Sequence, residues 1–395
     1  MNICIVTRSL PVHRTGGLER HTFDLAKGLV RKGNRVTVIT TAHPEGSDRE
    51  EKNGVLIHYL PGTVPSGYTP SFFSKLNRAV LEMHDETGFD ILHSQGFAGL
   101  TFRPPPDLSF VATLHGTLFS ETPLHRDRFQ KMSLFEKVKT VLRYRWRIGI
   151  HPLYKRYLKR LDLIFVDSDY SRKETMRDLA STEEKIRIVP LGIDISDPPS
   201  LDKTAARKRL NLPPDKIILF TLSRLEALKG IDVALEAAAI MKGRNLEFKY
   251  IIGGEGRLKS DLELLRKKLE LNEVKFAGKI PDDVLSDYFT AADFFIYPEI
   301  SHPAFGLVSV ESMFHGTAVL GSKSGAIPEV VKPETGRLFE RGDPNDLAEK
   351  LIRMIEDISE WNNKDALLRS YVENYYSLDR YINDTIKIYA EVKDR

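Results

Sequence analysis

The sequence predicts an α/β fold made of two domains, each with a mostly parallel β-sheet. Short apolar runs of strand length alternate with helical patterns along the chain, and this repetition is typical of parallel sheets. The alternation stops once, at residues 192–202, where Pro, Asp and Ser predominate. The 395 residues also exceed what one hydrophobic core usually holds, roughly 100–200 residues.

The first domain opens with a strand, a loop and a helix. Residues 3–6 form an apolar run, and apolar residues then recur at helical spacing over 18–30. Gly33 follows, a residue type that favours a helix end. Further strands are expected at 35–40, 54–60, 90–94, 110–116, 163–168 and 186–190.

The same alternation resumes after the break. We place the first domain at 1–195, a linker at 196–202 and the second domain at 203–375, and expect the C-terminal helix (about 376–395) to pack back onto the first domain. The expected strands of the second domain are 217–223, 248–254, 274–278, 294–298 and 317–322. Its expected helices are 231–241, 257–270, 281–291, 307–315, 344–357 and 364–392.

Composition excludes several classes of protein. Hydrophobic residues make up 41% and charged residues 29% of the chain, which is typical of globular proteins. The single cysteine, Cys4, cannot form an internal disulfide and is expected to be a buried core residue in a reducing compartment. No apolar run is long enough to span a bilayer, and the chain begins directly in a strand. We therefore expect a cytoplasmic protein.

The charge is unevenly distributed although the net charge is only +3. Residues 126–160 hold 12 basic and 2 acidic residues, and aromatic residues are interleaved with them. One interpretation is a solvated basic helix. The other is a surface that lies on an anionic membrane, at the inner face, with aromatic residues at the interface.

In the first domain, two strand-end loops carry residues suited to ligand binding. Gly16-Gly17 precedes a helix, whose N-terminus offers free N–H groups to an anion. His115 and His93 each end a strand, where an imidazole can act as a hydrogen-bond donor or an acid/base. A flexible turn and a sheet-capping histidine are the alternative interpretations.

In the second domain, the loop after the first strand holds Arg224 and Lys229, two cations suited to a diphosphate. The next strand ends in Gly253-Gly254-Glu255-Gly256, which permits close approach of backbone. Neither loop is a dinucleotide fingerprint or a Walker loop.

A third loop leads from Pro298 into a short apolar helix that opens at Phe305-Gly306 and contains one carboxylate, Glu311. The helix N-terminus can hold phosphate through main-chain N–H groups. Because its neighbours are apolar, we expect the carboxylate of Glu311 to have partners, and ribose hydroxyls are suitable ones.

Together these segments resemble the retaining glycosyltransferases of family 4, which have the GT-B fold, with two Rossmann-like domains facing a central cleft. The resemblance extends along nearly the whole chain. It rests on Gly16-Gly17 with Glu19-Arg20, residues 90–93, residues 113–116, Ser168 with Ser171, residues 189–194, Arg224, Lys229-Gly230, residues 253–256, Phe276, Gly278, Asp293, residues 305–308, Glu311 and Gly316.

The resemblance implies roles for these residues. Arg224 and Lys229 would bind the donor's diphosphate, Glu311 the nucleotide ribose, and His115 the donor sugar. Gly16-Gly17 would lie by the phosphates and the acceptor. The remaining donor-binding positions would be Gly254, Gly278, Lys279, Ile280, Phe305, Gly306, Leu307 and Val308. It further implies a nucleotide-sugar donor and no metal or other cofactor. Because the first domain of a GT-B enzyme usually presents the acceptor, the basic, aromatic segment 126–160 favours a lipid-linked acceptor, and a soluble acceptor sugar is the alternative.

One position departs from the family pattern. The family usually has two glutamates seven residues apart, and the first would fall at Pro303. Because that glutamate normally approaches the donor sugar, recognition of the sugar must differ here. Glu299, four residues earlier, is a candidate replacement.

Three alternatives stay open on the sequence. The first is a GT-B sugar-nucleotide epimerase or phosphorylase, and the second is a nucleotide-sugar binding protein with an altered site, which Pro303 alone favours. The third is a nucleic-acid-binding protein, against which stand the lack of a binding motif near 126–160 and the acidic remainder of the first domain. No nucleic-acid partner is therefore expected.

Overall fold

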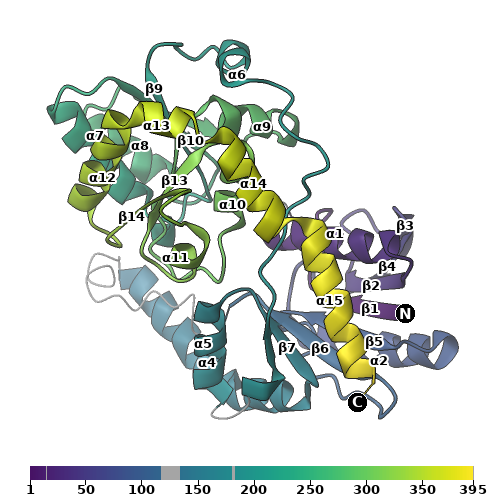
Figure 1. Ribbon diagram of the computed structural model, residues 1–395. Coiled ribbons are helices and arrows are strands. Elements are labelled where there is room, and N and C mark those ends of the chain that lie inside the picture. Colours follow the sequence, from purple (N-terminus) through teal and green to yellow (C-terminus); the bar gives the residue numbers. More distant parts are fainter. Residues whose placement is uncertain (15, 117–133, 180–182, 395) are drawn as a thin grey trace. The chain divides into compact units, whose positions relative to one another are not determined.

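The computed structural model describes residues 1–14, 16–116, 134–179 and 183–394. The chain forms two compact units (Figure 1). Unit 1 contains Met1–Asp194 and Leu378–Arg395, and unit 2 contains Ile195–Ser377. Each unit has its own largely parallel sheet with helices between the strands, which confirms the predicted fold class.

The sheet of unit 1 has the strand order β3-β4-β2-β1-β5-β6-β7-β8, and every pairing is parallel except that of β3 with β4. Its strands are β1 (Asn2–Val6), β2 (Arg35–Thr41), β3 (Arg49–Lys52), β4 (Val55–Leu60), β5 (Ile91–Gln95), β6 (Ser109–Leu114), β7 (Leu163–Val166) and β8 (Ile186–Ile188). Strand β1 is central and fully apolar after its first residue. Cys4 within it is buried, and burial raises the pKa of its thiol, so it is an inert core residue.

The helices of unit 1 include one from the C-terminus of the chain. They are α1 (Gly17–Arg31), α2 (Pro70–Thr87), α4 (Leu134–Arg160), α5 (Asp169–Leu179) and α15 (Leu378–Lys393). Helix α15, yellow in Figure 1, lies beside α1. Two ion pairs join it to the sheet, Arg187 of β8 with Glu391 at 2.6 Å and Lys393 with Asp90, the residue before β5, at 2.7 Å.

The sheet of unit 2 is entirely parallel and has the order β11-β10-β9-β12-β13-β14. Its strands are β9 (Ile217–Leu222), β10 (Phe248–Gly253), β11 (Val274–Gly278), β12 (Phe294–Tyr297), β13 (Ala318–Ser322) and β14 (Gly336–Phe339). Its helices are α6 (Lys203–Arg209), α7 (Ile231–Gly243), α8 (Lys259–Lys268), α9 (Asp282–Ala291), α10 (Leu307–Phe314), α11 (Ile327–Val330), α12 (Pro344–Glu356), α13 (Ile358–Asn362) and α14 (Asp365–Tyr376), besides a 3₁₀ turn at Ala227–Lys229.

Two strands were not expected from the sequence. The polar strand β3 lacks alternation because it is an exposed antiparallel edge strand, where charged residues discourage pairing with another chain. Strand β14 has only four residues and begins at a glycine, Gly336, which shortens its apolar signal. The short helix α11 was likewise not predicted.

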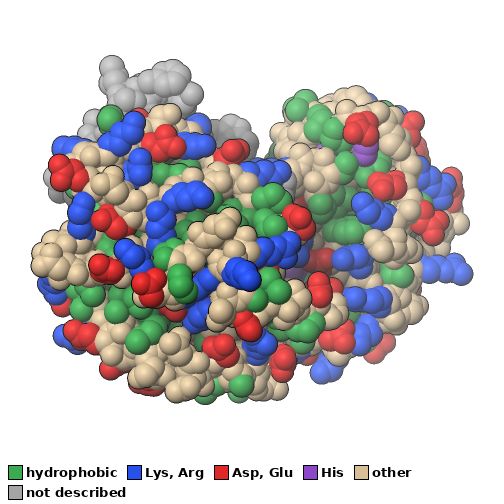
Figure 2. Space-filling view, turned by 90° about the horizontal axis from the view of Figure 1, so that it is seen from above, with side chains coloured by type: hydrophobic (Ala, Val, Ile, Leu, Met, Phe, Trp, Pro, Cys, Tyr) green, Lys and Arg blue, Asp and Glu red, His purple; other side chains and the backbone are tan. Residues whose placement is uncertain are grey.

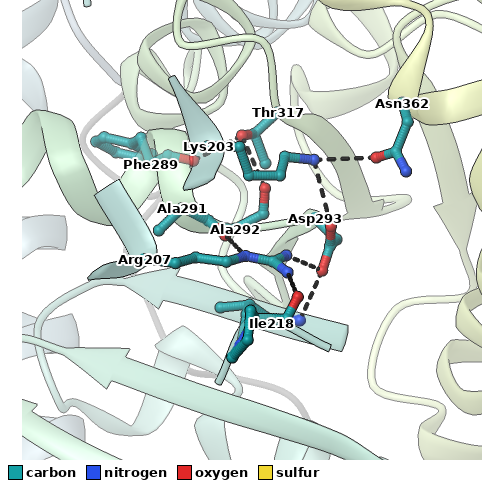
Figure 3. Close-up of polar contacts among 10 residues, drawn as sticks. Lys203, Arg207, Ile218, Phe289, Ala291, Ala292, Asp293, Thr317 and Asn362 are labelled. Atoms are coloured by element: carbon teal, nitrogen blue, oxygen red, sulfur yellow. Dashed lines mark hydrogen bonds and ion pairs between the residues drawn. The ribbon is translucent and has the colours of Figure 1, made fainter. Parts of the chain in front are cut away.

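Asp293, one of the residues in the family resemblance, has a structural role that is visible in Figure 3. Its carboxylate accepts hydrogen bonds from Arg207 Nη2 at 2.6 Å, Lys203 Nζ at 3.2 Å and the backbone N–H of Ile218 at 2.7 Å. This buried cluster ties α6, the first helix after the break in the sequence, to strands β9 and β12. It lies at the amino ends of these strands, opposite the loops that form the candidate site.

Candidate functional site

In unit 2, four adjacent strands end at loops that contain the candidate donor-binding residues. Strands β11, β10, β9 and β12 are neighbours and parallel, so their carboxyl ends lie along one edge of the sheet. This edge is where ligands bind in open α/β sheets. Each loop is recognisable separately in the sequence, and the strand order brings the loops together.

Lys229 and Glu299 join the loops that follow β9 and β12. The ammonium of Lys229 donates to Glu299 Oε2 at 2.6 Å. The loops are also linked by the backbone, since the N–H of Ile300 donates to Leu228 O at 2.8 Å. Gly230 has a φ of +67°, and a Cβ there would meet Pro298 O at 1.9 Å, so only glycine permits this approach.

Glu299 is fully buried, and both of its carboxylate oxygens are engaged. Oε2 accepts from Lys229, and Oε1 accepts from the hydroxyl of Ser301. Its backbone carbonyl accepts from Ser322 Oγ at 2.5 Å. The sequence suggested Glu299 as a contact of the donor sugar, but the structure gives it Lys229 as a partner and no exposed surface.

Arg224 lies in the same loop as Lys229 but is exposed. The carboxylate of the neighbouring Glu226 is held by Arg257 at 2.8 Å, and this pair lowers the pKa of Glu226. The two cations of this loop differ in their surroundings. Arg224 is a surface cation, whereas Lys229 is fixed by the buried carboxylate of Glu299.

The glycines that follow β10 permit contact between backbone segments. Gly254 has a φ of +117°, and a Cβ there would meet Ser223 O at 1.9 Å. A Cβ on Gly256 would meet Leu225 O at 2.4 Å. These glycines therefore pack the β10 loop onto the loop of Arg224, and that contact, rather than a ligand, already requires glycine.

The loop after β11 adjoins this pair. Gly278 has a φ of +70°, and its carbonyl accepts from the N–H of Gly254 at 2.7 Å. Ile280 is buried against Gly253, whereas Lys279, which lies between Gly278 and Ile280, is exposed. The loop thus presents one long cationic side chain and keeps its apolar neighbour inside.

Helix α10 opens at Gly306, whose φ of +115° places it in the left-handed region, and no side chain caps the first turn. Phe305 is buried against Tyr376, while Leu307 and Val308 are half-buried. Glu311, in the second turn, is also half-buried. The uncapped N–H groups and the carboxylate lie on the helix that follows the Glu299 loop.

Pro303, where the family pattern has a glutamate, is held by the loop after β13. Its carbonyl accepts from the N–H of Ala326 at 2.9 Å. Gly325, with a φ of +52°, packs so closely that a Cβ would meet Pro303 O at 2.4 Å.

In unit 1, His115 directly follows β6. Its Nδ1 lies 3.1 Å from Asp167 Oδ2 and its Nε2 lies 2.9 Å from Gln95 Oε1. Gly16 is the residue before α1, in extended conformation and without a side-chain cap. These residues come from the same unit but from different strand ends.

His93, the second histidine expected at a strand end, is buried within unit 1. Its Nδ1 contacts the hydroxyl of Tyr389 at 2.5 Å and its Nε2 contacts Thr113 Oγ1 at 2.7 Å. Burial lowers its pKa to about 3, so the ring is neutral. The two imidazoles do converge, through Gln95, whose Nε2 lies 3.3 Å from His93 Nε2. His93 is nevertheless a core residue.

Sequence reasoning missed the partners of the predicted residues. Asp167 and Gln95 follow or end strands, so their strand-end position was the available signal. Tyr389 lies 296 residues from His93 in the sequence, and no local pattern indicates that contact.

Comparison with known proteins identifies the family. Residues 15–197 match the family described as "Glycosyltransferase Family 4", and residues 202–371 match "Glycosyl transferases group 1". The chain is 32% identical over 371 residues to a D-inositol 3-phosphate glycosyltransferase of Acidothermus cellulolyticus, an alignment that covers 86% of this chain and 78% of the relative. The chain belongs to glycosyltransferase family 4.

Other similarities agree with membership in family 4. The phosphatidylinositol N-acetylglucosaminyltransferase gpi3 subunit of Schizosaccharomyces pombe is 26% identical over 386 residues, covering 95% of this chain and 78% of the relative. The structure of Anabaena HepE in complex with UDP-glucose superimposes with a TM-score of 0.72 and 20% identity, covering 98% of this chain and all of the other. The fold is GT-B, and this family 4 protein is a glycosyltransferase.

No described helix is both long and apolar enough to cross a membrane. Across the same part of the chain, no three His, Cys, Asp or Glu side chains are grouped as metal ligands.

Proposed function

We propose that this glycosyltransferase moves a sugar from a nucleoside-diphosphate sugar to an acceptor hydroxyl with retention of anomeric configuration and without a metal ion. The observation that carries the proposal is the fixed Lys229 ammonium at the carboxyl edge of the unit 2 sheet. Its buried partner Glu299 orients one of its three N–H donors and leaves two for an anion. A diphosphate is an anion of matching charge and reach.

The surrounding residues supply the other requirements of a nucleoside diphosphate. Arg224 adds a second cation, which can bind phosphate oxygens bidentately. The uncapped N-terminus of α10 at Gly306 offers main-chain N–H groups to a phosphate. Glu311 on the same helix accepts from the ribose hydroxyls, and the loop of Lys279 lies where the base would bind. These roles follow the family pattern residue by residue.

Glu299 acts in this proposal as a positioning residue for Lys229. A part-buried ammonium is stable only with a partner, and a fully buried carboxylate at 2.6 Å is a strong one. Because position 303 is a proline in this chain, the donor sugar must be contacted by groups other than a carboxylate at that position.

In the proposed reaction, the leaving diphosphate accepts the proton of the acceptor hydroxyl on the same face of the sugar. The C–O bond to the diphosphate breaks, the acceptor oxygen bonds to the anomeric carbon, and the proton leaves with the diphosphate. The protein then contributes orientation and charge neutralisation. His115 and the Gly16-Gly17 backbone of unit 1 are the residues proposed to contact the donor sugar and the acceptor.

The donor assignment is tested by release of nucleoside diphosphate from UDP-, GDP- and ADP-sugars, with UDP-glucose first because the similar HepE structure contains it. We expect nucleoside diphosphate to be released from the donors of one nucleotide base, and the rate of release to increase when an acceptor is added. Conversion of a nucleotide sugar into its epimer by the enzyme alone would instead favour the epimerase alternative.

For the acceptor, we propose a lipid-linked molecule bound by a protein that lies on the inner face of the membrane. Residues 126–133 of the basic segment lie outside the described residues. In α4, Val141, Leu142 and Ile148 are exposed, between 45% and 61%, beside the exposed Arg145. Exposed apolar residues among cations suit an anionic lipid surface. The gpi3 subunit, a relative, is named for a phosphatidylinositol acceptor.

Part of α4 has a structural role as well. Tyr154, Tyr157 and Leu158 are buried in the core of unit 1, and Arg160 donates to Leu100 O at 2.6 Å. The membrane proposal therefore concerns the first half of the helix. Sedimentation with anionic and neutral vesicles tests it: we expect binding to anionic vesicles that salt weakens, and substitution of Leu142 and Ile148 by Ser to reduce it. If the protein sedimented with neither kind of vesicle, the membrane proposal would be wrong and a soluble acceptor would be favoured.

A further inference from the structure

Arg8 lies at the carboxyl edge of the unit 1 sheet, among the same strand ends as His115. It comes two residues after the end of β1, which pairs with β5, and β5 pairs in turn with β6. In the parallel register of β1 and β5, Val6 lies opposite Ser94. Arg8 therefore leaves the sheet beside Gly96, and His115 follows the next strand along. This is the edge at which parallel α/β sheets bind ligands.

Contacts between three loops fix the position of Arg8. Thr41, the last residue of β2, donates its hydroxyl to Arg8 O at 2.8 Å and accepts from the N–H of Ser66 at 3.0 Å. Thr41 thus joins the loop after β1 to the loop between β4 and α2, which also contains Tyr68. The guanidinium carbon of Arg8 lies over the Tyr68 ring, 5.1 Å from its centroid. A cation in this position is attracted by the ring face.

The guanidinium of Arg8 lacks a counter-charge within the described residues. Its side chain is half-buried, and across the described part of the chain it takes part in no ion pair. Glu19, buried at the start of α1, instead accepts from Ser9 Oγ at 2.8 Å. Burial raises the pKa of Tyr68 to about 12, so the phenol is neutral at pH 7. A cation that is partly removed from water is stabilised when an anion joins it.

The ligand that suits this position is an anion with an apolar part. A guanidinium stacked on a ring keeps the N–H groups along its edge, and their planar fork matches two oxygens of a phosphate. The loops that hold Arg8 and Tyr68 also expose one apolar side chain each, Val12 at 43% and Val64 at 57%. A phosphate attached to a lipid combines the two properties.

We propose that Arg8, held over Tyr68, binds a phosphate group of the acceptor. The assignment to the acceptor rests on the proposed function, because it is there that unit 1 receives this substrate. The existence of a phosphate site at Arg8 does not rest on it. Lys229 and Arg224, the cations assigned to the donor, belong to unit 2, so the two substrates would use separate cations.

Calorimetric titration of the full chain with inorganic phosphate and with dihexanoyl phosphatidic acid, a short-chain lipid phosphate, tests the site. All proteins carry Lys229→Ala, so that phosphate bound at the donor site contributes little. We expect Arg8→Gln to raise the Kd at least tenfold, and Arg8→Lys to raise it less, because lysine keeps the charge but not the planar fork.

The matched control is Arg187→Gln. Arg187 is also a half-buried arginine of unit 1, but it pairs with Glu391 at 2.6 Å. This variant should bind both probes with unchanged Kd. Tyr68→Phe keeps the ring and should do the same, whereas Tyr68→Leu should raise the Kd about threefold through loss of the cation–π contact. Circular dichroism shows which variants fold, and Arg8→Lys and Tyr68→Leu still test the site if Arg8→Gln does not.

The two probes distinguish the source of the phosphate. Tighter binding of the lipid phosphate would support a lipid-linked acceptor, and equal binding would support a soluble phosphorylated one. The inference is overturned if neither probe binds saturably, or if Arg8→Gln and Arg187→Gln bind equally well. Since no step of this test needs sugar transfer, phosphate binding through Arg8 in a protein that releases no nucleoside diphosphate would support the site and count against the proposed function alone.

Discussion

At the residue scale, donor binding in the proposed reaction depends on one ion pair that joins two loops of unit 2. Lys229 and Glu299 lie 70 residues apart in the sequence and 2.6 Å apart in the fold. The pair converts a long, flexible side chain into a fixed cation. Such a group can contribute to the transition state because it needs no rearrangement when the negative charge develops.

Replacing either donor-site cation should reduce turnover far more than stability. For Lys229→Ala we expect a loss of roughly 2–4 kcal/mol of transition-state stabilisation, about 30- to 1,000-fold in kcat/KM. Arg224→Ala should also lower kcat/KM. Steady-state kinetics and thermal unfolding measure the two effects separately. If both folded variants kept wild-type kcat/KM, the diphosphate would bind elsewhere.

Glu299→Gln should lower kcat/KM by about tenfold, because Lys229 loses its charged partner and becomes mobile. Glu340→Gln is the matched control, since this exposed carboxylate also pairs with a lysine, Lys323, and exposed pairs contribute little. A direct sugar contact of Glu299 would show a different result: its variant would change the preference between donor sugars while the affinity for free nucleoside diphosphate stayed constant.

Glu311→Gln should weaken binding of the free nucleoside diphosphate, because an ionised carboxylate is the better acceptor for ribose hydroxyls. We expect a Kd increase of about tenfold by calorimetry, equivalent to ~1.4 kcal/mol. The corresponding 2′-deoxynucleotide should bind wild type and variant more equally. An unchanged Kd would make Glu311 a residue of the helix surface.

At the element scale, the C-terminal helix α15 is joined to the strand ends of unit 1 by buried polar contacts. Tyr389 contacts His93 of β5, and the phenol ring packs on Phe165 of β7. Because His93 supports Gln95, and Gln95 faces His115, the helix underlies the loop of the candidate site. The last helix of the chain thus stabilises the positions of residues near its beginning.

This arrangement predicts acid sensitivity. The pKa of His93 is about 3 in the folded protein, below its usual 6.5, so the folded state favours the neutral ring. The associated stability is present above about pH 6.5 and is lost as the pH falls towards 3. Between pH 7.5 and 5, the wild type should lose about 2 kcal/mol more than His93→Gln.

Urea unfolding of unit 1, followed by fluorescence at both pH values, measures this difference. His43→Gln is the control, because His43 lies in a half-buried loop position outside the cluster. An equal pH dependence in wild type and His93→Gln would mean that His93 does not contribute to acid sensitivity.

At the scale of the whole molecule, the fold class could be predicted from the sequence, because the fold class depends on local patterns. Apolar runs and helical periodicity predicted most strands of both sheets, but missed the polar edge strand β3 and the short β14. Surface charge is also a whole-chain property: on the face in Figure 2, Lys and Arg side chains are interspersed with Asp and Glu, consistent with the net charge of +3.

The site could be predicted only in part. Loops at strand ends can be located from local sequence patterns, so Arg224, Lys229 and His115 could be predicted as site residues. Their partners could not, because Glu299, Asp167 and Gln95 reach them through strand order and loop path, which depend on tertiary packing. The same reason explains Gly254, whose glycine requirement comes from a contact with the backbone of Ser223.

The proposed reaction is retaining sugar transfer from a nucleoside-diphosphate donor. Its most direct test is ¹H NMR of the anomeric proton during the reaction of an α-linked nucleotide sugar with an acceptor accepted by the enzyme, with Lys229→Ala as the control. We predict that an α-linked product appears first, together with free nucleoside diphosphate, and that the control forms it at least 30-fold more slowly. A β-linked first product would contradict retention, and equal rates in wild type and control would contradict the role of Lys229.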